Sequence, residues 1–191
     1  MIRTFVAVFP PPEVREALFQ AARNLPTSGD FRLVGKEKIH LTLMFLGDVA
    51  EDDLDNVKRV LQPIRERHDP FEVSISAFGA FPSDRKARIL WAGVEEGSEH
   101  LRTVAEDVEN LLAPAGFERE TRPYVPHLTL GRARTRRTEL DTSETSLPAL
   151  RFTVSALDLV KSTPSKNGIN YSILATYPFL SSQHFSTSAR Q

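Results

Sequence analysis

The tetrapeptide His-Leu-Thr-Leu occurs twice in this chain, at residues 40–43 and again at residues 127–130. Each copy lies in a segment with the period-2 alternation of a half-buried strand, so its histidine and threonine share one face and its two leucines the other. With 5 His and 14 Thr among 191 residues, random placement would put a threonine two positions after a histidine about 0.4 times. A lone histidine is usually structural, but this repeat favours a functional pair.

The composition is that of an ordinary globular protein, with 191 residues, 40% of them hydrophobic. A formal net charge of -1 excludes the overall basic field of proteins that coat nucleic acid, so phosphate recognition has to be local. The absence of cysteine excludes disulfides, thiolate metal ligands and a cysteine nucleophile. The apolar run at residues 2–9 is too short for a membrane span or a signal peptide. We therefore expect a cytoplasmic protein without membrane association.

Apolar periodicity and turn residues predict the secondary structure along the chain. Helical spacing predicts helices at residues 14–25, 54–64 and 101–112. Alternating or continuous apolar runs predict strands at residues 3–9, 31–34, 38–46, 71–76, 89–94, 124–132, 150–160 and 170–177. The apolar phase slips within residues 150–160, which predicts a bulge or bend. The polar residues 135–146 are typical of a surface loop, and residues 181–191 of a flexible tail.

The two tetrapeptides also indicate an internal duplication. They lie 87 residues apart (127 minus 40), and a predicted helix precedes each of the two histidine strands. Strand-rich halves covered by helices predict an α+β fold, with two lobes in a single domain over residues 1–180. If a pseudo-twofold axis relates the halves, the two His-Thr pairs face one another across a central cleft.

Two opposed histidines can divide acid and base roles, because imidazole titrates near neutrality. On this hypothesis His40 and His127 are catalytic, and the Thr42 and Thr129 hydroxyls donate to an anionic oxygen between them. A phosphodiester fits such a site, since its attacking and leaving oxygens lie in line on opposite sides of phosphorus. A zinc site would need a third protein ligand, and the three remaining histidines are typical of surface positions: His68, His100 and His184. We therefore expect neither a metal nor another cofactor.

Beyond these residues, the chain resembles the 2H phosphoesterases of the RNA 2',3'-cyclic phosphodiesterase type, also called the 2'-5' RNA ligase family. That family carries two His-x-Thr-x motifs, and the resemblance extends over about residues 2–180. Supporting segments are residues 3–8, 45–49, 90–94, 122–127 and 131–132.

The resemblance implies an RNA or oligonucleotide substrate with a 2',3'-cyclic phosphate end, opened by water to a 2'-phosphate. It assigns His40 as the proton donor to the leaving 3'-oxygen and His127 as the base; the residues alone leave this assignment open. Run backwards, the same site would join RNA ends. We expect a monomer. The alternatives are a module that binds RNA ends without turnover, and an enzyme for the cyclic phosphate of a small nucleotide derivative.

Two further features could serve RNA but have structural explanations as well. The arginines after the second motif suit phosphate contacts or a solvated loop equally: Arg132, Arg134, Arg136 and Arg137. Phe45 could stack on a base. Strict alternation, however, puts Phe45 and Arg132 on the leucine side of their strands, which favours core packing for Phe45. Neither is included in the predicted site.

Overall fold

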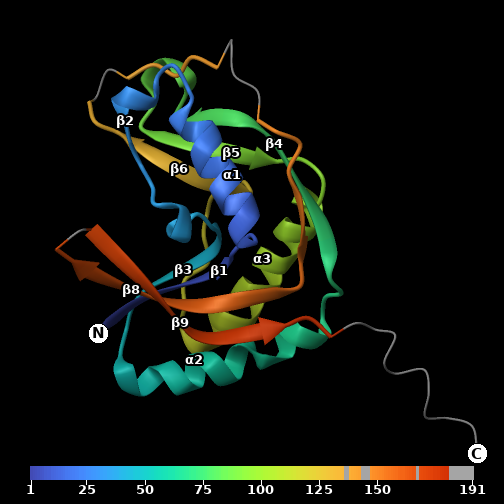
Figure 1. The fold of residues 1–191 in the computed structure, drawn as a ribbon. Helices are drawn as coiled ribbons and strands as arrows, with labels where there is room; N and C mark the ends of the chain where they lie inside the picture. The colour runs from blue at the N-terminus through green and yellow to red at the C-terminus, as the bar shows by residue number, and fades with distance from the viewer. Residues whose placement is uncertain (136–137, 143–146, 167, 181–191) are drawn as a thin grey trace, which may run out of the picture.

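The computed structural model describes residues 1–135, 138–142, 147–166 and 168–180 (Figure 1). Its helices are α1 (Pro12–Arg23), α2 (Leu54–Leu61) and α3 (Ser98–Leu112), with short 3-10 turns between elements. Its strands are β1 (Ile2–Val8), β2 (Phe31–Leu33), β3 (Leu41–Val49), β4 (Phe71–Phe81), β5 (Ile89–Val94), β6 (His127–Ala133), β7 (Arg151–Val154), β8 (Ala156–Ser165) and β9 (Gly168–Pro178).

Within these residues the strands form one curled antiparallel sheet in the order β7-β4-β5-β6-β3-β1-β8-β9, with β2 also paired to β6. The sheet has two parts, which we call the His40 lobe (β1, β3, β8 and β9) and the His127 lobe (β2 and β4 to β7). The lobes join where β3 meets β6, with Leu41 opposite Leu128. The predicted α+β class with two strand-rich lobes is confirmed.

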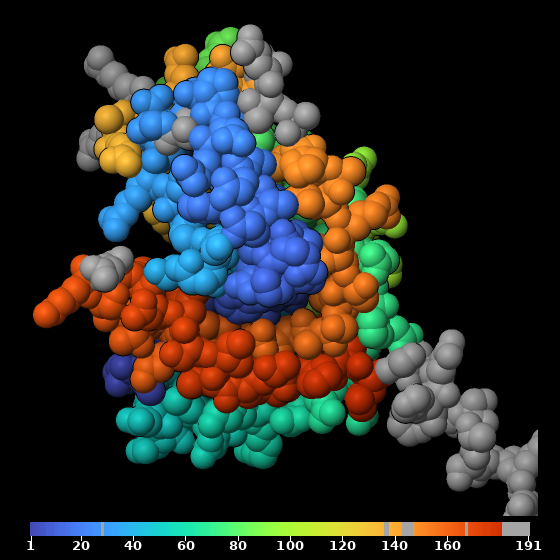
Figure 2. Space-filling view, viewed as in Figure 1, coloured from blue at the N-terminus to red at the C-terminus, as the bar shows by residue number. Residues whose placement is uncertain are grey.

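Helices α1 and α3 each pack on the lobe opposite to the one that contains the motif strand following them in sequence. Helix α1 precedes β3 in sequence but contacts β2 and β6, whereas α3 precedes β6 but contacts β3 and α2. Figure 2 shows α1 in blue above the edge strand β9 in red. The two helices are therefore exchanged between the lobes, and this exchange ties the lobes together through the main core.

The leucines of both motifs anchor the strands in that core, as the alternation predicts. Leu41 and Leu128 are fully buried, and Leu43 and Leu130 nearly so. At about 1.5 to 3 kcal/mol for each buried leucine, the four side chains fix which face of β3 and β6 points inward. The histidines and threonines are consequently held on the opposite face, half-buried.

Several predicted elements differ in their bounds from those observed, and three of these differences bear on the site. Both histidine strands begin later than expected, at Leu41 and His127, because a 3-10 turn η2 (Lys36–Lys38) precedes the first and prolines, which cannot donate to a ladder, precede the second. The predicted strand at 150–160 divides at Ser155: β7 pairs with β4 in one lobe and β8 with β1 in the other. The predicted bend is thus the point where the chain passes between lobes.

The polar segment at 135–146 is not wholly a surface loop. Thr138 is buried, and its carbonyl accepts a hydrogen bond from the Ala87 amide at 2.9 Å. The amide of Leu140 donates to the Asp84 carbonyl at 2.9 Å. Residues 143–146 and the predicted tail, 181–191, lie outside the described residues.

Candidate active site

The pairing of β3 with β6 sets the positions of the two motifs. Because Leu41 lies opposite Leu128 in an antiparallel register, continuing that register puts residue 40 across from residue 129 and residue 42 across from residue 127. An antiparallel pair has a local twofold axis between its strands. The structure therefore brings together His40, Thr42, His127 and Thr129 on one face, related by the twofold axis that the duplication predicts.

Both histidines are oriented by the same hydrogen bond. His40 Nδ1 lies 2.6 Å from the Lys38 carbonyl, and His127 Nδ1 lies 2.7 Å from the Val125 carbonyl. A carbonyl oxygen can only accept, so Nδ1 carries the proton in each ring and Nε2 is the basic nitrogen of the neutral form. Thr42 Oγ1 lies 3.0 Å from His40 Nε2, so its hydroxyl can donate to that nitrogen.

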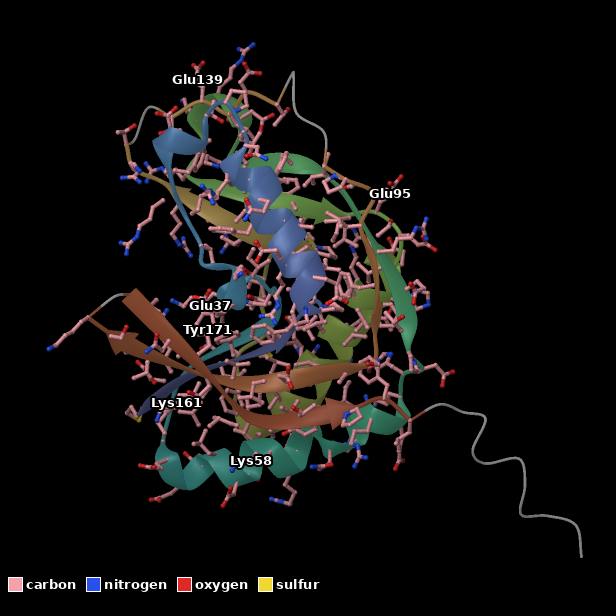
Figure 3. All side chains as sticks on the ribbon, viewed as in Figure 1. Glu37, Lys58, Glu95, Glu139, Lys161 and Tyr171 are labelled. Carbon is pink, nitrogen blue, oxygen red and sulfur yellow. The ribbon has the colours of Figure 1, made fainter. Side chains whose placement is uncertain are left out.

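Each imidazole contacts aromatic rings. His40 contacts Phe5, Phe9 and Tyr171, with ring centroids at 5.0, 5.3 and 5.3 Å. His127 contacts Phe81 at 5.1 Å in a T-shaped arrangement. Figure 3 labels Tyr171, which lies on β9 of the His40 lobe. These rings restrict rotation of the imidazoles and exclude water from one side of each.

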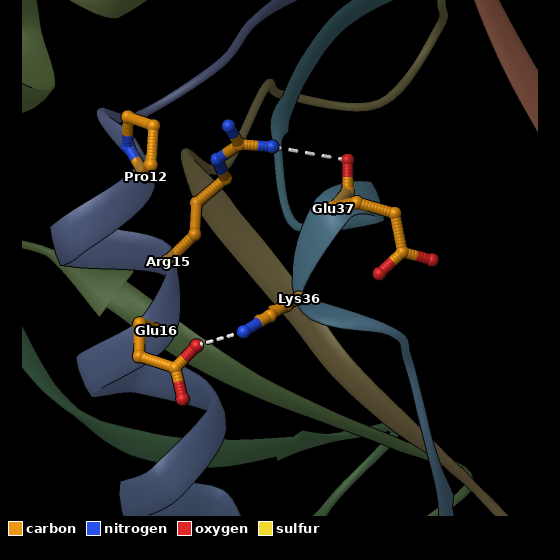
Figure 4. A pocket seen from close by; sticks show the side chains of 5 residues that line it. All are labelled: Pro12, Arg15, Glu16, Lys36 and Glu37. Atoms are coloured by element: carbon orange, nitrogen blue, oxygen red, sulfur yellow. Dashed lines mark hydrogen bonds and ion pairs between the residues drawn. The ribbon is translucent and has the colours of Figure 1, made fainter.

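The carbonyl that orients His40 belongs to turn η2, which is itself held against α1 (Figure 4). Arg15 Nη1 donates to the Glu37 carbonyl at 3.1 Å, and Lys36 pairs with Glu16. These contacts line a surface hollow of about 350 Å³. Since both of its cations already have partners, we interpret this hollow as a support for η2 and hence for the His40 ring.

The electrostatics of the pair favour neutral imidazoles in the unliganded protein. Burial lowers the pKa of both histidines, against the Nδ1 hydrogen bonds, which raise it. The charge of His127 lowers the pKa of His40 further, so the two rings are close enough to interact. Protonation of one ring therefore opposes protonation of the other, as a site with one acid and one base requires.

A β-bulge in each motif strand overturns the alternation expected beyond the tetrapeptide. On β3, Thr42 pairs with Ala7 and Met44 with Val6, so Leu43 is an extra residue. On β6, Thr129 pairs with Trp91 and Gly131 with Leu90, so Leu130 is the extra residue. The bulges thus fall at the same position of the two copies. Each bulge turns the residues that follow it to the opposite face.

Phe45 consequently lies on the histidine face, and its predicted core packing is wrong. Phe45 is 70% exposed, whereas the preceding Met44 is buried. Phe45 pairs with Phe5, whose ring lies 6.1 Å from that of Phe45 and 5.0 Å from that of His40. The side chain is therefore available beside the site as an open aromatic surface.

Arg132 occupies the matching position on β6, five residues after His127. It pairs with Ile89, which shares a face with Trp91 and hence with Thr129, so the predicted leucine-side orientation is wrong here too. The preceding Gly131 is buried, as Met44 is on β3. Burial raises the pKa of Tyr171 and the Arg132 charge lowers it, which puts the guanidinium near a ring that contacts His40. The site therefore has its own cation.

Comparison with known proteins identifies the family. A family model described as the 2'-5' RNA ligase superfamily matches residues 10–165. The chain belongs to this superfamily. A relative from Aquifex aeolicus named RNA 2',3'-cyclic phosphodiesterase is 32% identical over 137 residues, covering 69% of this chain and 71% of that protein. One of the same name from Thermotoga maritima is 28% identical over 176 residues, covering 91% and 93%.

Solved structures share the fold of this superfamily member. The protein TT0787 of Thermus thermophilus is 28% identical, with a TM-score of 0.80 over 94% of this chain and 99% of that one. E. coli LigT in its apo form is 24% identical, with a TM-score of 0.75 over 93% of this chain and 97% of that one. The curled sheet described above is thus the fold of these proteins.

The other histidines of this superfamily member, and the arginines that follow Arg132, differ in burial and in hydrogen-bond partners. His68 is not a surface residue as predicted: it is mostly buried, with Nε2 3.0 Å from Asp107. His100 is exposed and stacks on Phe71. Arg134 Nε lies 3.4 Å from the Phe31 carbonyl, and the predicted phosphate contacts of Arg136 and Arg137, like His184, fall outside the described residues.

The expectations about metal and membrane concern side-chain clusters and helix length in the described residues. Among them, no group of three or more His, Asp or Glu side chains has the arrangement of a metal site. In the same part of the chain, no helix has the length and apolarity required to cross a membrane.

Proposed function

We propose that this protein hydrolyses the 2',3'-cyclic phosphate at RNA ends to a 2'-phosphomonoester, with His40 and His127 as acid and base. The observation that carries the proposal is the matched pair of imidazoles, each with Nδ1 bonded to a backbone carbonyl so that Nε2 is the basic nitrogen of the neutral ring. The relatives named RNA 2',3'-cyclic phosphodiesterase support cyclic phosphodiesterase chemistry for the family. We expect this chain to use the same chemistry.

In the proposed step, water attacks phosphorus from the side opposite the 3'-oxygen. The new P–O bond forms as the P–O3' bond breaks, which leaves the phosphate on the 2'-oxygen. His127 Nε2 takes a proton from the attacking water, and protonated His40 gives one from Nε2 to the departing 3'-oxygen. The assignment of acid and base follows the family resemblance, because the local geometry of the two rings is nearly the same.

The other side chains on this face have roles that suit their chemistry. The Thr42 and Thr129 hydroxyls can donate to the non-bridging phosphate oxygens, which gain charge in the transition state. Arg132 can stabilise the same charge with a paired hydrogen bond from its planar guanidinium. Phe45 offers its exposed ring to the terminal base. Together they would bind one nucleotide with its cyclic phosphate between the imidazoles.

The test is product analysis of a short RNA with a 2',3'-cyclic phosphate end, incubated with EDTA and the wild-type protein. We expect conversion to the 2'-phosphate, with the chelator without effect. RNA that is retained but not converted would contradict the proposal and favour the binding module. Conversion only of free cyclic nucleotides would favour the small-molecule enzyme, and joined RNA products would show that ligation by reversal occurs.

A further inference from the structure

A second arginine lies on the histidine face, on β2. Arg32 pairs directly with Arg132 in the β2–β6 ladder, so the two side chains emerge from the same face of adjacent strands. Like charges directly opposite one another destabilise a sheet. Among the described residues, the ion pairs that form include neither Arg32 nor Arg132. An uncompensated pair of guanidiniums beside a phosphodiester site is suited to two phosphates.

The β8–β9 hairpin connects Arg32 to the active site from the other lobe. Arg32 Nη2 lies 3.9 Å from the position that a Cβ would occupy on Gly168, at the tip of this hairpin. Three residues further along β9, Tyr171 contacts His40 and lies near Arg132. In Figure 2 a notch separates the light-blue segment that contains β2 from the orange end of the hairpin. Arg32 therefore lies beside the hairpin that carries Tyr171, and Tyr171 in turn contacts His40.

We infer that Arg32 binds the phosphodiester that precedes the terminal nucleotide, which makes the protein selective for RNA chains over free cyclic nucleotides. This inference rests on the proposed function. Arg132 comes from the strand that carries His127, and Arg32 from its neighbour β2, about 5 Å from that strand. With the cyclic phosphate between the imidazoles and beside Arg132, the next phosphate of the chain reaches Arg32.

Nearby cations are less suited to this role. Arg134 already donates toward the Phe31 carbonyl. Lys36 pairs with Glu16, and Arg15 bonds to the Glu37 carbonyl. Arg32, by contrast, is exposed and has its guanidinium beside Gly168, which itself has no side chain to occupy that space.

The experiment compares kcat/KM for a trinucleotide that ends in a 2',3'-cyclic phosphate with kcat/KM for the corresponding mononucleotide. In Arg32→Gln, the ratio of the two values should fall about 10-fold, because one charge-assisted hydrogen-bond partner of the chain is lost. The salt dependence for the trinucleotide should become shallower by about 0.7 in the log-log slope, as expected for one phosphate contact of a single strand. Arg32→Lys, which keeps the charge, should retain most of that slope.

Two control variants test whether the change in the ratio of kcat/KM values is specific to Arg32. Arg59→Gln removes an arginine on α2 that bonds to Asn56, and should leave both kcat/KM values unchanged. Arg132→Gln should lower both values in parallel and leave their ratio near that of the wild type. A wild-type ratio near one, or an equal loss for both substrates in Arg32→Gln, would overturn the inference alone. Turnover of neither substrate by the wild-type protein would overturn the proposed function and this inference with it.

Discussion

The two motif strands have the same tetrapeptide, the same Nδ1 hydrogen bond to the carbonyl two residues earlier, and the same bulge at the fourth motif residue. They differ at the first residue that the bulge turns outward, which is Phe45 on β3 and Arg132 on β6. The duplication thus provides the two equivalent imidazoles that the proposed mechanism uses for proton transfer. The substitution beside them makes one side of the site aromatic and the other cationic, as a nucleotide with a base and a phosphate requires.

The largest expected effect comes from the feature that the two strands share. His40→Ala and His127→Ala should each lower kcat by about 10²- to 10⁴-fold, or about 3 to 5 kcal/mol of transition-state stabilisation. The leucines that anchor each strand are unchanged, so the circular dichroism spectrum and the thermal midpoint should stay close to those of the wild type. Turnover near the wild-type level in either folded variant would contradict the proposal that the two histidines act as acid and base.

A change of leaving group should separate the equivalent histidines into acid and base. A nucleoside phosphodiester with a p-nitrophenolate leaving group needs little protonation as its bond to phosphorus breaks. We therefore expect His40→Ala to recover at least about 10-fold of its loss on this substrate, whereas His127→Ala recovers little. The measurement is the ratio of kcat/KM values for the two substrates in each variant. Recovery confined to His127→Ala would reverse the assignment of roles.

Arg132→Gln should have a smaller effect, about 10- to 100-fold on kcat/KM, because a charged hydrogen-bond donor to the phosphate is replaced by a neutral one. Phe45→Ala should lose about 10-fold, from stacking worth about 1 to 3 kcal/mol for each base. The Phe45 loss should disappear with a cyclic phosphate that carries no base, while the Arg132 loss should persist. If both losses respond alike to removal of the base, the two sides of the site do not differ in function.

The smallest expected effect is on stability. Burial lowers the pKa of His40 and His127 in the folded protein, so near pH 6.5 the unfolded chain binds more protons than the folded one. The free energy of unfolding should therefore decrease as the pH falls through about 6.5 and below. His127→Ala should weaken this pH dependence. Urea titrations of both proteins at pH 5 and pH 7.5 give the free energy of unfolding at each pH. An equal change in this free energy between the two pH values in the wild type and in His127→Ala would contradict the burial argument.

Local sequence was sufficient to predict most of the strands and helices, though not all of their bounds, because apolar periodicity reports which face of an element is buried. Periodicity also placed Thr42 with His40, and Thr129 with His127, on the face opposite the leucines. It failed at Phe45 and Arg132, since a bulge depends on which residues of β1 and β5 pair across the ladder. The sequence of one strand does not determine its register with the neighbouring strand.

The sequence by itself determined the local half of the site: two histidines, each with a threonine on the same face and leucines on the other to bury. Only the tertiary structure decided how those halves meet, through the pairing of Leu41 with Leu128, the exchange of α1 and α3 between lobes, and the two bulges. The physical reason is that side-chain alternation is a property of one strand. Register, bulges and lobe contacts instead depend on strands that are distant in sequence, such as β2, β6 and β9, which bring Arg32, Arg132 and Tyr171 near one another.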